Sequence, residues 1–106
     1  MKNKETLSRL VNALVQKYSP EQIILFGSYA WSRPTKHSDI DLFIVKNTRK
    51  KPKERFSEVQ KILYGMHQSI PIEPIVLTPK ELKRRIAIND SFIIRILKKG
   101  KILYGQ

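Results

Sequence analysis

The fold of this chain is decided by residues 22–45, which read QIILFGSYAWSRPTKHSDIDLFIV. One apolar run, Gln22–Phe26, ends at Gly27-Ser28, and a second run extends from Asp39 to Val45. Apolar runs of about 4–8 residues that are bounded by turn residues are typical of buried strands. Residues 29–38 between them are polar and contain a proline, which predicts one short helical turn followed by a loop.

On both sides of this stretch, segments whose apolar residues have helical spacing alternate with segments typical of strands. Apolar residues at helical spacing run from Leu7 to Tyr18, with Thr6 as the expected N-cap and Ser19-Pro20 after the end. The next expected elements are a basic loop at 46–52, a helix with Phe56, Val59, Leu63 and Met66 on its apolar face, and a break at 68–71. A strand at 72–77 and a helix opened by the capping box of Thr78 and Glu81 follow. The last expected elements are a helix at about 90–99, ended by Gly100, and an edge strand at 102–104. This order predicts the α/β (α+β) class, with a small mixed sheet on which helices pack.

Length and composition narrow the class of protein. The chain has 106 residues, 41% of them hydrophobic, and this length favours one domain that spans residues 1–106. It has no cysteine, which excludes a disulfide scaffold, a cysteine-based zinc site and a thiol nucleophile. No apolar run reaches the roughly 18–20 residues of a membrane helix, and the residues after Lys2 and Lys4 do not resemble a signal peptide. The expected compartment is the cytoplasm, with no membrane partner.

The charge points to an acidic partner. The net charge is +12, from 21 Lys+Arg against 9 Asp+Glu. Six basic side chains lie between Lys46 and Arg55, and four more lie between Lys80 and Arg85. Because no aromatic residue is interleaved with the first run, a protein with an acidic face is favoured over RNA or DNA, and Trp31 or Tyr29 is a candidate anchor. A solvated basic surface is the alternative.

Paired carboxylates are the main candidates for chemistry. Asp39 and Asp41 lie two residues apart in the expected strand, so both side chains project from one face. Such a pair is costly to bury on an apolar face unless a cation neutralises it, and oxygen ligands suit Mg²⁺. Glu73 opens the next strand in the same way, so neighbouring strands would gather three carboxylates around one or two ions. Asp-x-Asp is also common at strand ends, and Pro74 is compatible with a solvent-facing Glu73 on an edge strand.

A turn that could bind phosphate precedes these carboxylates. Gly27-Ser28 closes a strand and opens a helical turn, which offers backbone N–H groups and a hydroxyl to phosphate oxygens. Alone, this dipeptide is common in turns. Asp39 and Asp41 follow Ser28 by 11 and 13 residues, and the combination indicates a nucleoside triphosphate chelated by a metal ion.

The segment Gly27–Leu42 resembles the Gly-Ser … Ser-Asp-x-Asp-Leu signature of the DNA polymerase beta-like nucleotidyltransferases. The short chain is similar to their minimal nucleotidyltransferase (MNT) group, and the order of elements matches over nearly the whole chain. The resemblance implies that Gly27 and Ser28 bind the triphosphate of ATP, and that Asp39 and Asp41 are catalytic ligands of magnesium.

The chain departs from the family pattern at two places. After Ala30 the family commonly has Arg-Gly, whereas this chain has Trp31-Ser32. The third catalytic and metal-binding carboxylate of the family, usually an aspartate, falls on Glu73, which is followed by Pro74.

The resemblance also implies an activity and a partner. The enzyme would transfer AMP from ATP to an acceptor hydroxyl, and similar proteins are often encoded beside small helical HEPN proteins as toxin–antitoxin pairs. In that setting the chain would be the antitoxin of a type VII-like pair and would modify a tyrosine of the HEPN toxin. Larger relatives carry an additional helical domain, so the partner or a second copy of the chain in a homo-oligomer would supply that part of the site. The alternatives are a catalytically weak nucleotide-binding antitoxin and a basic nucleic-acid-binding module.

Overall fold

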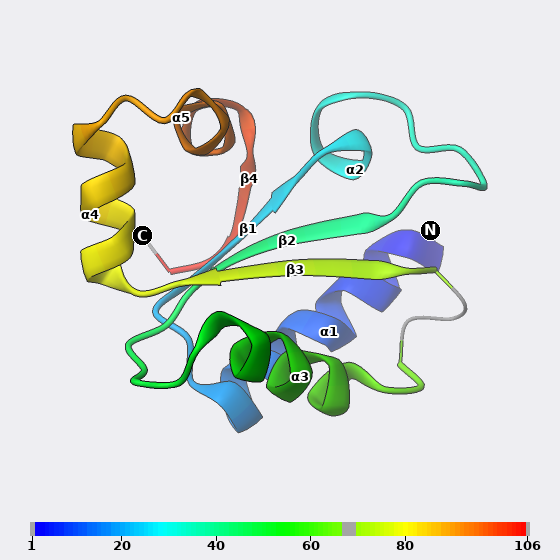
Figure 1. The fold of residues 1–106 in the computed structure, drawn as a ribbon. Coiled ribbons are helices and arrows are strands. Elements are labelled where there is room, and N and C mark those ends of the chain that lie inside the picture. The colour runs from blue at the N-terminus through cyan, green and yellow to red at the C-terminus, as the bar shows by residue number, and fades with distance from the viewer. Residues whose placement is uncertain (1, 67–69, 106) are drawn as a thin grey trace.

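A computed structural model describes residues 2–66 and 70–105. Its helices and strands are α1 (Lys2–Tyr18), β1 (Gln22–Phe26), α2 (Ser28–Trp31), β2 (Ile40–Val45), α3 (Pro52–Leu63), β3 (Ile72–Leu77), α4 (Pro79–Ala87), α5 (Ser91–Lys99) and β4 (Lys101–Tyr104) (Figure 1). This order confirms the one expected from the sequence. The expected helix break at Gln68 and Ser69 lies outside the described residues.

The four strands form one mixed sheet in the order β3-β2-β1-β4. β1 pairs in antiparallel fashion with both β2 and β4, whereas β2 and β3 are parallel. Parallel neighbours need a crossover connection, and α3 supplies it between β2 and β3. The predicted α+β class with a small mixed sheet is therefore confirmed.

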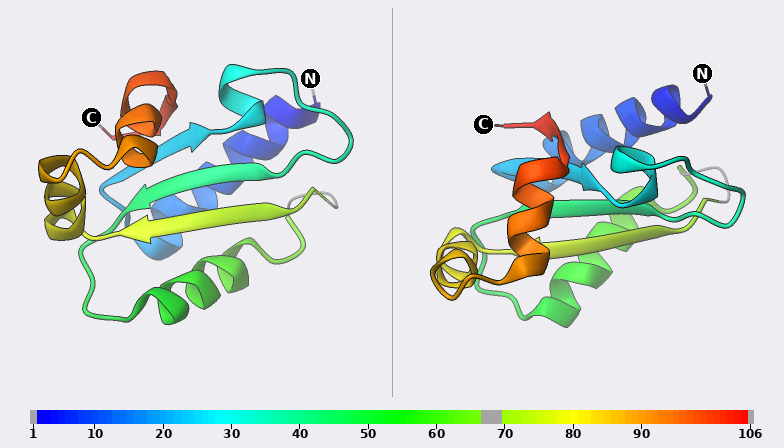
Figure 2. Two further views of the ribbon diagram at one scale, coloured as in Figure 1. Left: turned by 45° about the horizontal axis from the view of Figure 1, so that its top comes forward. Right: turned by 90° about the horizontal axis from the view of Figure 1, so that it is seen from above.

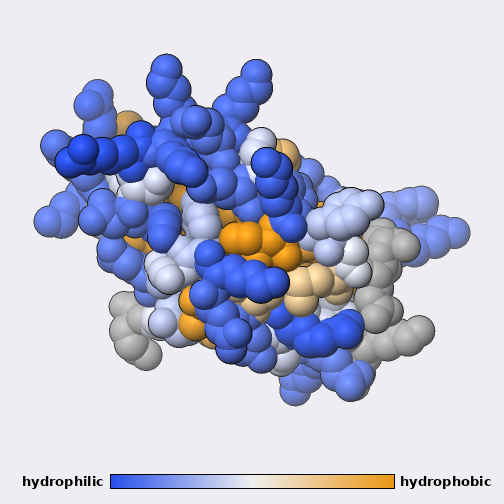
Figure 3. All heavy atoms as spheres, turned by 90° about the horizontal axis from the view of Figure 1, so that it is seen from below, coloured by the Kyte–Doolittle hydropathy of each residue, from blue (hydrophilic) through white to orange (hydrophobic). Residues whose placement is uncertain are grey.

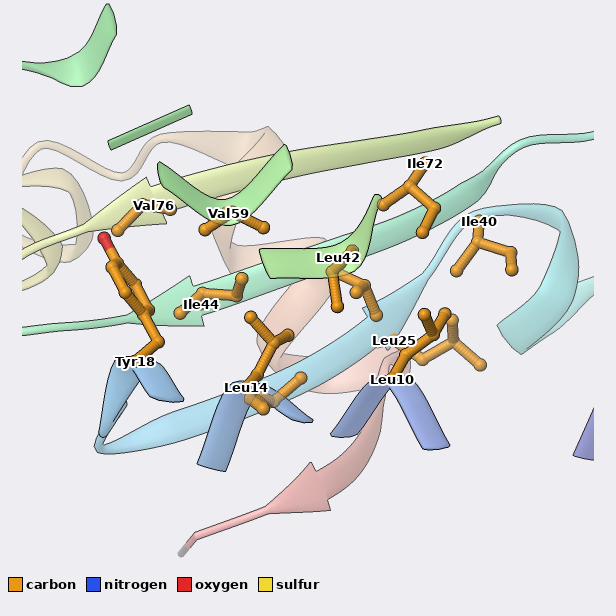
Figure 4. Close-up of a cluster of buried hydrophobic side chains, with 12 residues drawn as sticks. Leu10, Leu14, Tyr18, Leu25, Ile40, Leu42, Ile44, Val59, Ile72 and Val76 are labelled. Atoms are coloured by element: carbon orange, nitrogen blue, oxygen red, sulfur yellow. The ribbon is translucent and has the colours of Figure 1, made fainter. Parts of the chain in front are cut away.

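Helices cover both faces of the sheet, as the two views of Figure 2 show. On one face, α1 and α3 pack over a hydrophobic core to which all of the first three strands contribute. Its central members include Leu10 and Leu14 of α1, Leu42 and Ile44 of β2, and Val59 of α3 (Figure 4). The opposite face is smaller, with Ile93 and Ile96 of α5 against Phe26, Phe43, Val45 and Leu77 of the strands. Within the described ranges, no helix is long and apolar enough to cross a membrane.

One predicted helix end differs in the structure, and one is confirmed. Thr6 does not cap α1, because the helix begins at Lys2 and Thr6 is a buried residue within it, 2% exposed. The four residues before Thr6 are polar and continue the helix without adding to its apolar period. Gly100 ends α5 as predicted, with φ −70°. Its role is steric, since a Cβ there would lie 2.5 Å from Ile24 Cγ2.

The apolar face of α3 was predicted correctly at Val59 and Leu63 but incorrectly at Phe56. The helix begins at Pro52, within the expected basic segment, and it buries Arg55, Val59 and Leu63. Phe56 is 42% exposed instead of lying in the core. Arg55 takes the buried position because its polar atoms find partners there.

Arg55 joins three separate parts of the chain. Its Nε donates to Lys50 O at 2.7 Å, and Nη1 donates to Val76 O at 3.1 Å. The two terminal nitrogens also meet the carboxylate of Glu81 at 2.8 and 3.2 Å, and this contact lowers the pKa of Glu81. Glu81 in turn closes the predicted capping box with Thr78 at the start of α4. The guanidinium thus fixes α3 and α4 to the end of β3.

We expect Arg55→Met to lower the free energy of unfolding by about 2–3 kcal/mol. The loss is expected because the buried carbonyl of Val76 would be left without a donor, whereas Glu81, whose side chain is 40% exposed, could return to water. Urea unfolding followed by circular dichroism measures the change. Arg49→Met, at an exposed position, is the control and should change stability by less than about 0.5 kcal/mol. Equal losses in both variants would contradict a clamping role for Arg55.

Candidate active site

The end of β1 and the start of β2 bring the glycine turn against a carboxylate. Phe26, the last residue of β1, pairs with Asp41 of β2, so Gly27 follows directly beside the Asp41 side chain. Gly27 has φ +75°, and a Cβ built on it would lie 2.1 Å from Asp41 Oδ2. Only glycine permits both this backbone conformation and this approach. A ligand of Asp41 would therefore also meet the backbone of the turn.

The third carboxylate lies on the other side of Asp41. Glu73 is its register partner on the parallel neighbour β3, and cross-strand partners share a face of the sheet. Asp39 precedes β2 by one residue and is half-buried, as Asp41 is, whereas Glu73 is exposed. The expectation that the two strands are neighbours is confirmed, while the expectation that Asp39 lies within the strand is wrong. The face that carries these residues is the one on which α5 packs.

The charges of the two neighbouring carboxylates act on Asp41. Burial, the negative charge of Asp39 and that of Glu73 together raise the pKa of Asp41 to about 6. Across residues 2–66 and 70–105, no ion pair joins any of the three to a lysine or arginine. A divalent cation would relieve this repulsion, and the donors are the oxygen ligands that magnesium prefers.

The residues present fit a cation that is bound only in part by protein. In the described part of the chain, no three Asp, Glu, His or Cys side chains stand close enough to enclose a metal ion. Magnesium commonly uses one or two carboxylates and takes its other ligands from water and substrate phosphates. The close approach of Gly27 to Asp41 Oδ2 places the backbone of the turn beside that carboxylate, which suits this mode of binding.

The turn into α2 presents its polar groups without a side-chain cap. Gly27 is the N-cap residue of α2, and no side chain caps this end of the helix. Gly27 O accepts the N–H groups of Ala30 and Trp31 at 2.9 and 3.0 Å. The N–H groups of the first turn, at Ser28 and Tyr29, have no partner within a helix by construction. Together with the Ser28 hydroxyl, these N–H groups are the donors that directly follow Gly27, the residue in contact with Asp41.

An aromatic and cationic cluster beside α2 was not found from the sequence. Trp31 packs on Phe26, with ring centroids 6.2 Å apart, and Phe92 of α5 meets Phe26 edge-on at 5.7 Å. The guanidinium of Arg95 lies 4.8 Å from the centre of the Trp31 ring. Trp31 is thus engaged in packing within the chain. Only the spacing of Phe92 and Arg95 on one side of a helix could have indicated this, because their partners lie some sixty residues earlier.

The first basic run is less available than its composition suggests. Lys46 Nζ donates to Tyr18 O and lies 4.8 Å from the centre of the Tyr18 ring, and Lys50 pairs with Glu58 at 2.6 Å. Arg55 is buried. Three of the six basic side chains are therefore engaged in contacts within the molecule, which reduces the basic surface that this run can offer to a partner.

Comparisons with known proteins agree with this fold. A solved structure described as a "putative nucleotidyltransferase from Sulfolobus solfataricus" superposes with a TM-score of 0.67 over 99% of this chain and 82% of that chain, at 18% identity. That likeness defines the fold as that of a nucleotidyltransferase. Residues 7–104 match the family described as "Nucleotidyltransferase domain".

Two relatives from Methanocaldococcus jannaschii are each 33% identical to this chain. One match covers 94% of this chain and 70% of the relative, and the other covers 98% and 100%. Both relatives bear the name "Putative protein adenylyltransferase". The chain belongs to the nucleotidyltransferase domain family, and it is a nucleotidyltransferase. The family resemblance seen in the sequence is thereby confirmed.

The raised pKa of Asp41 has a consequence for stability. The pKa is about 6 in the folded chain against an ordinary value of 3.8, so ionisation of Asp41 opposes folding. This opposition is absent below about pH 4 and complete once the pH has risen through about 6. We expect Asp41→Asn to raise the free energy of unfolding of the metal-free protein by about 1–2 kcal/mol at pH 8, after allowance for solvent screening.

Thermal unfolding in EDTA at pH 8 and pH 4 tests this expectation. The stabilisation should be present at pH 8 and largely lost at pH 4. Glu21→Gln removes an exposed carboxylate elsewhere and should show no such difference between the two pH values. A destabilised Asp41→Asn variant at pH 8 would contradict the inferred repulsion.

Proposed function

We propose that this nucleotidyltransferase transfers AMP from ATP to a hydroxyl group of another protein. The observation that carries the proposal is the contact between the Gly27 backbone and the Asp41 carboxylate, where a Cβ would approach Oδ2 to 2.1 Å. This contact brings the backbone N–H donors of the turn, which would bind phosphate, next to carboxylate oxygens, which would bind a cation. The names of the two relatives that are 33% identical support a protein as the acceptor.

In the proposed reaction the acceptor oxygen attacks the α-phosphorus of ATP in line with the bond to the pyrophosphate. The new oxygen–phosphorus bond forms, the bond to the β-phosphate oxygen breaks, and pyrophosphate leaves while the acceptor proton passes to solvent. Magnesium, when bound, would neutralise charge on the phosphates and lower the pKa of the acceptor hydroxyl. Asp39 and Asp41 would hold it, and the Gly27-Ser28 turn would orient the triphosphate.

Glu73 has a separate proposed role at the acceptor side of the site. It is exposed at the start of the edge strand β3, directly beside Asp41 in register. An incoming hydroxyl can therefore approach it from outside the sheet. We assign it to a second magnesium ion that would bind the attacking oxygen.

The proposed acceptor is a tyrosine of a small helical HEPN-type protein, with this chain as the antitoxin of a type VII-like pair in the cytoplasm. The support is the family resemblance of the Gly27–Leu42 segment. The absence of a side-chain nucleophile from the proposed mechanism is consistent with direct transfer to the partner. A second copy of the chain is the other candidate for completing the acceptor side.

Replacing both aspartates should abolish metal-dependent transfer while the fold is retained. Asp39→Asn with Asp41→Asn removes two anionic ligands without changing side-chain volume, so we expect AMP transfer to fall by at least about 100-fold. Radiolabelled ATP and the partner protein provide the assay, and circular dichroism checks the fold. Glu21→Gln should retain full activity. Calorimetry that gave equal magnesium–ATP affinity in the wild type and the double variant would refute the assignment.

Glu73→Gln distinguishes the acceptor side from the nucleotide side. If Glu73 serves only the attacking oxygen, the variant should transfer AMP about 100-fold more slowly while magnesium–ATP affinity changes less than about threefold. Single-turnover rates and calorimetry measure the two quantities separately. Turnover at the wild-type rate would show that Glu73 is only a residue of an edge strand.

A further inference from the structure

A groove runs along the free edge of β3, between the start of α3 and the helix α4. It has a volume of about 530 Å³. Its floor is apolar and its rim is basic, with Phe56, Pro74, Ile75 and Leu77 below and Lys53 and Arg84 beside them. The helical spacing predicted that Phe56 would lie in the core, but in the structure it is 42% exposed.

The edge of β3 is poorly suited to pairing with another strand. Two outward-facing carbonyls of β3 already accept side-chain donors: Ile72 O accepts from Gln60 Nε2 at 3.1 Å, and Val76 O accepts from Arg55 Nη1 at 3.1 Å. Between them, Pro74 has no N–H to donate. An edge protected in this way resists strand addition. A ligand of the groove must therefore be recognised through its side chains.

The charges on the groove are positive. Glu81 is compensated by Arg55, and Arg85 is compensated by Asp90 at 3.0 Å. Lys53 and Arg84 are exposed, and neither takes part in an ion pair within residues 2–66 and 70–105. Figure 3 shows hydrophilic side chains crowded on the left of the molecule seen from below, where Figure 1 places α4 and the start of α3. An occupant with acidic and apolar side chains complements this surface.

The groove leads to the active site along one strand. Ile75 and Leu77 lie on the same side of β3 as Glu73, because side chains alternate along a strand. Ile75 is two residues from Glu73, about 6.6 Å along the strand. A polypeptide seated in the groove could place a neighbouring residue beside the carboxylates.

We propose that this groove binds an acidic, partly apolar segment of the protein acceptor and so presents the hydroxyl to be modified. The inference rests on the proposed protein-directed transfer of AMP. A nucleic acid fits less well, because among the described residues only two unpaired cations line the rim, whereas a nucleic-acid backbone needs a longer row of them.

The probe is a fluorescein-labelled peptide of about ten residues with alternating Glu and Leu and a central Tyr. Such a peptide spans about 33 Å when extended, close to the 37 Å long axis of the molecule. Anisotropy with the full chain, in the absence of nucleotide, measures its affinity. We expect a peptide with Gln in place of Glu to bind at least tenfold more weakly. Arg84→Glu, Lys53→Glu and Phe56→Ser should each weaken binding of the Glu peptide at least fivefold.

Arg9→Glu is the matched control, since it reverses a charge on an exposed position of α1 outside the groove. It should change the affinity less than twofold. Groove variants that bind the peptide as the Arg9→Glu variant does would overturn the proposal. So would single-stranded RNA that displaces the peptide, with an affinity that falls steeply with salt and is lost in Arg84→Glu.

Transfer of AMP to the Tyr of the same peptide separates this proposal from the function on which it rests. If AMP is transferred and the groove variants leave the KM for the peptide unchanged, the groove is not the acceptor site, although the function stands. If the peptide binds through the groove and no AMP is transferred under any metal condition, the proposed function fails while the acidic docking surface remains. A rise in KM at least fivefold, with kcat unchanged, supports both.

Discussion

The close approach of the Gly27 backbone to the Asp41 carboxylate is the contact on which the arrangement of the site depends. It requires a residue with positive φ and no side chain at the end of β1, because a Cβ would fall 2.1 Å from Oδ2. It also requires the antiparallel register that pairs Phe26 with Asp41. Any change of that register by one residue would turn Asp41 to the face covered by α1 and α3. The register of β1 and β2 and the conformation of the Gly27 turn therefore depend on each other.

The same contact carries a cost in stability. A half-buried carboxylate with two further carboxylates nearby has its pKa raised to about 6, and no basic side chain of the described residues compensates it. Glu81 and Asp90, by contrast, are each paired with an arginine and accept backbone N–H groups at a helix start. A local violation of the rule that buried charges are paired is typical of sites that bind a charged ligand. The repulsion is what a metal–nucleotide complex would relieve.

Arg55 organises the other side of the molecule. By binding Val76 O, Lys50 O and Glu81 it fixes the end of β3, the start of α3 and the start of α4 in one arrangement. It also takes up an edge carbonyl that could otherwise pair with a foreign strand. The walls of the edge groove are thus held by the same residue that closes its backbone to strand addition. A buried arginine here serves shape and specificity as much as stability.

The sequence by itself determined the elements and the local chemistry. Periodicity and turn residues were sufficient for the order of helices and strands, the capping box at Thr78 and the Asp-x-Asp pair after the Gly-Ser turn. Only the tertiary structure decided that Asp41 lies between Phe26 and Glu73, that Arg55 is buried while Phe56 is exposed, and that Arg95 covers Trp31. The reason is the range of the interactions. A helical or extended period is a property of neighbouring residues, whereas Arg55 is stabilised in the interior by partners 21 and 26 residues away, which no local pattern contains.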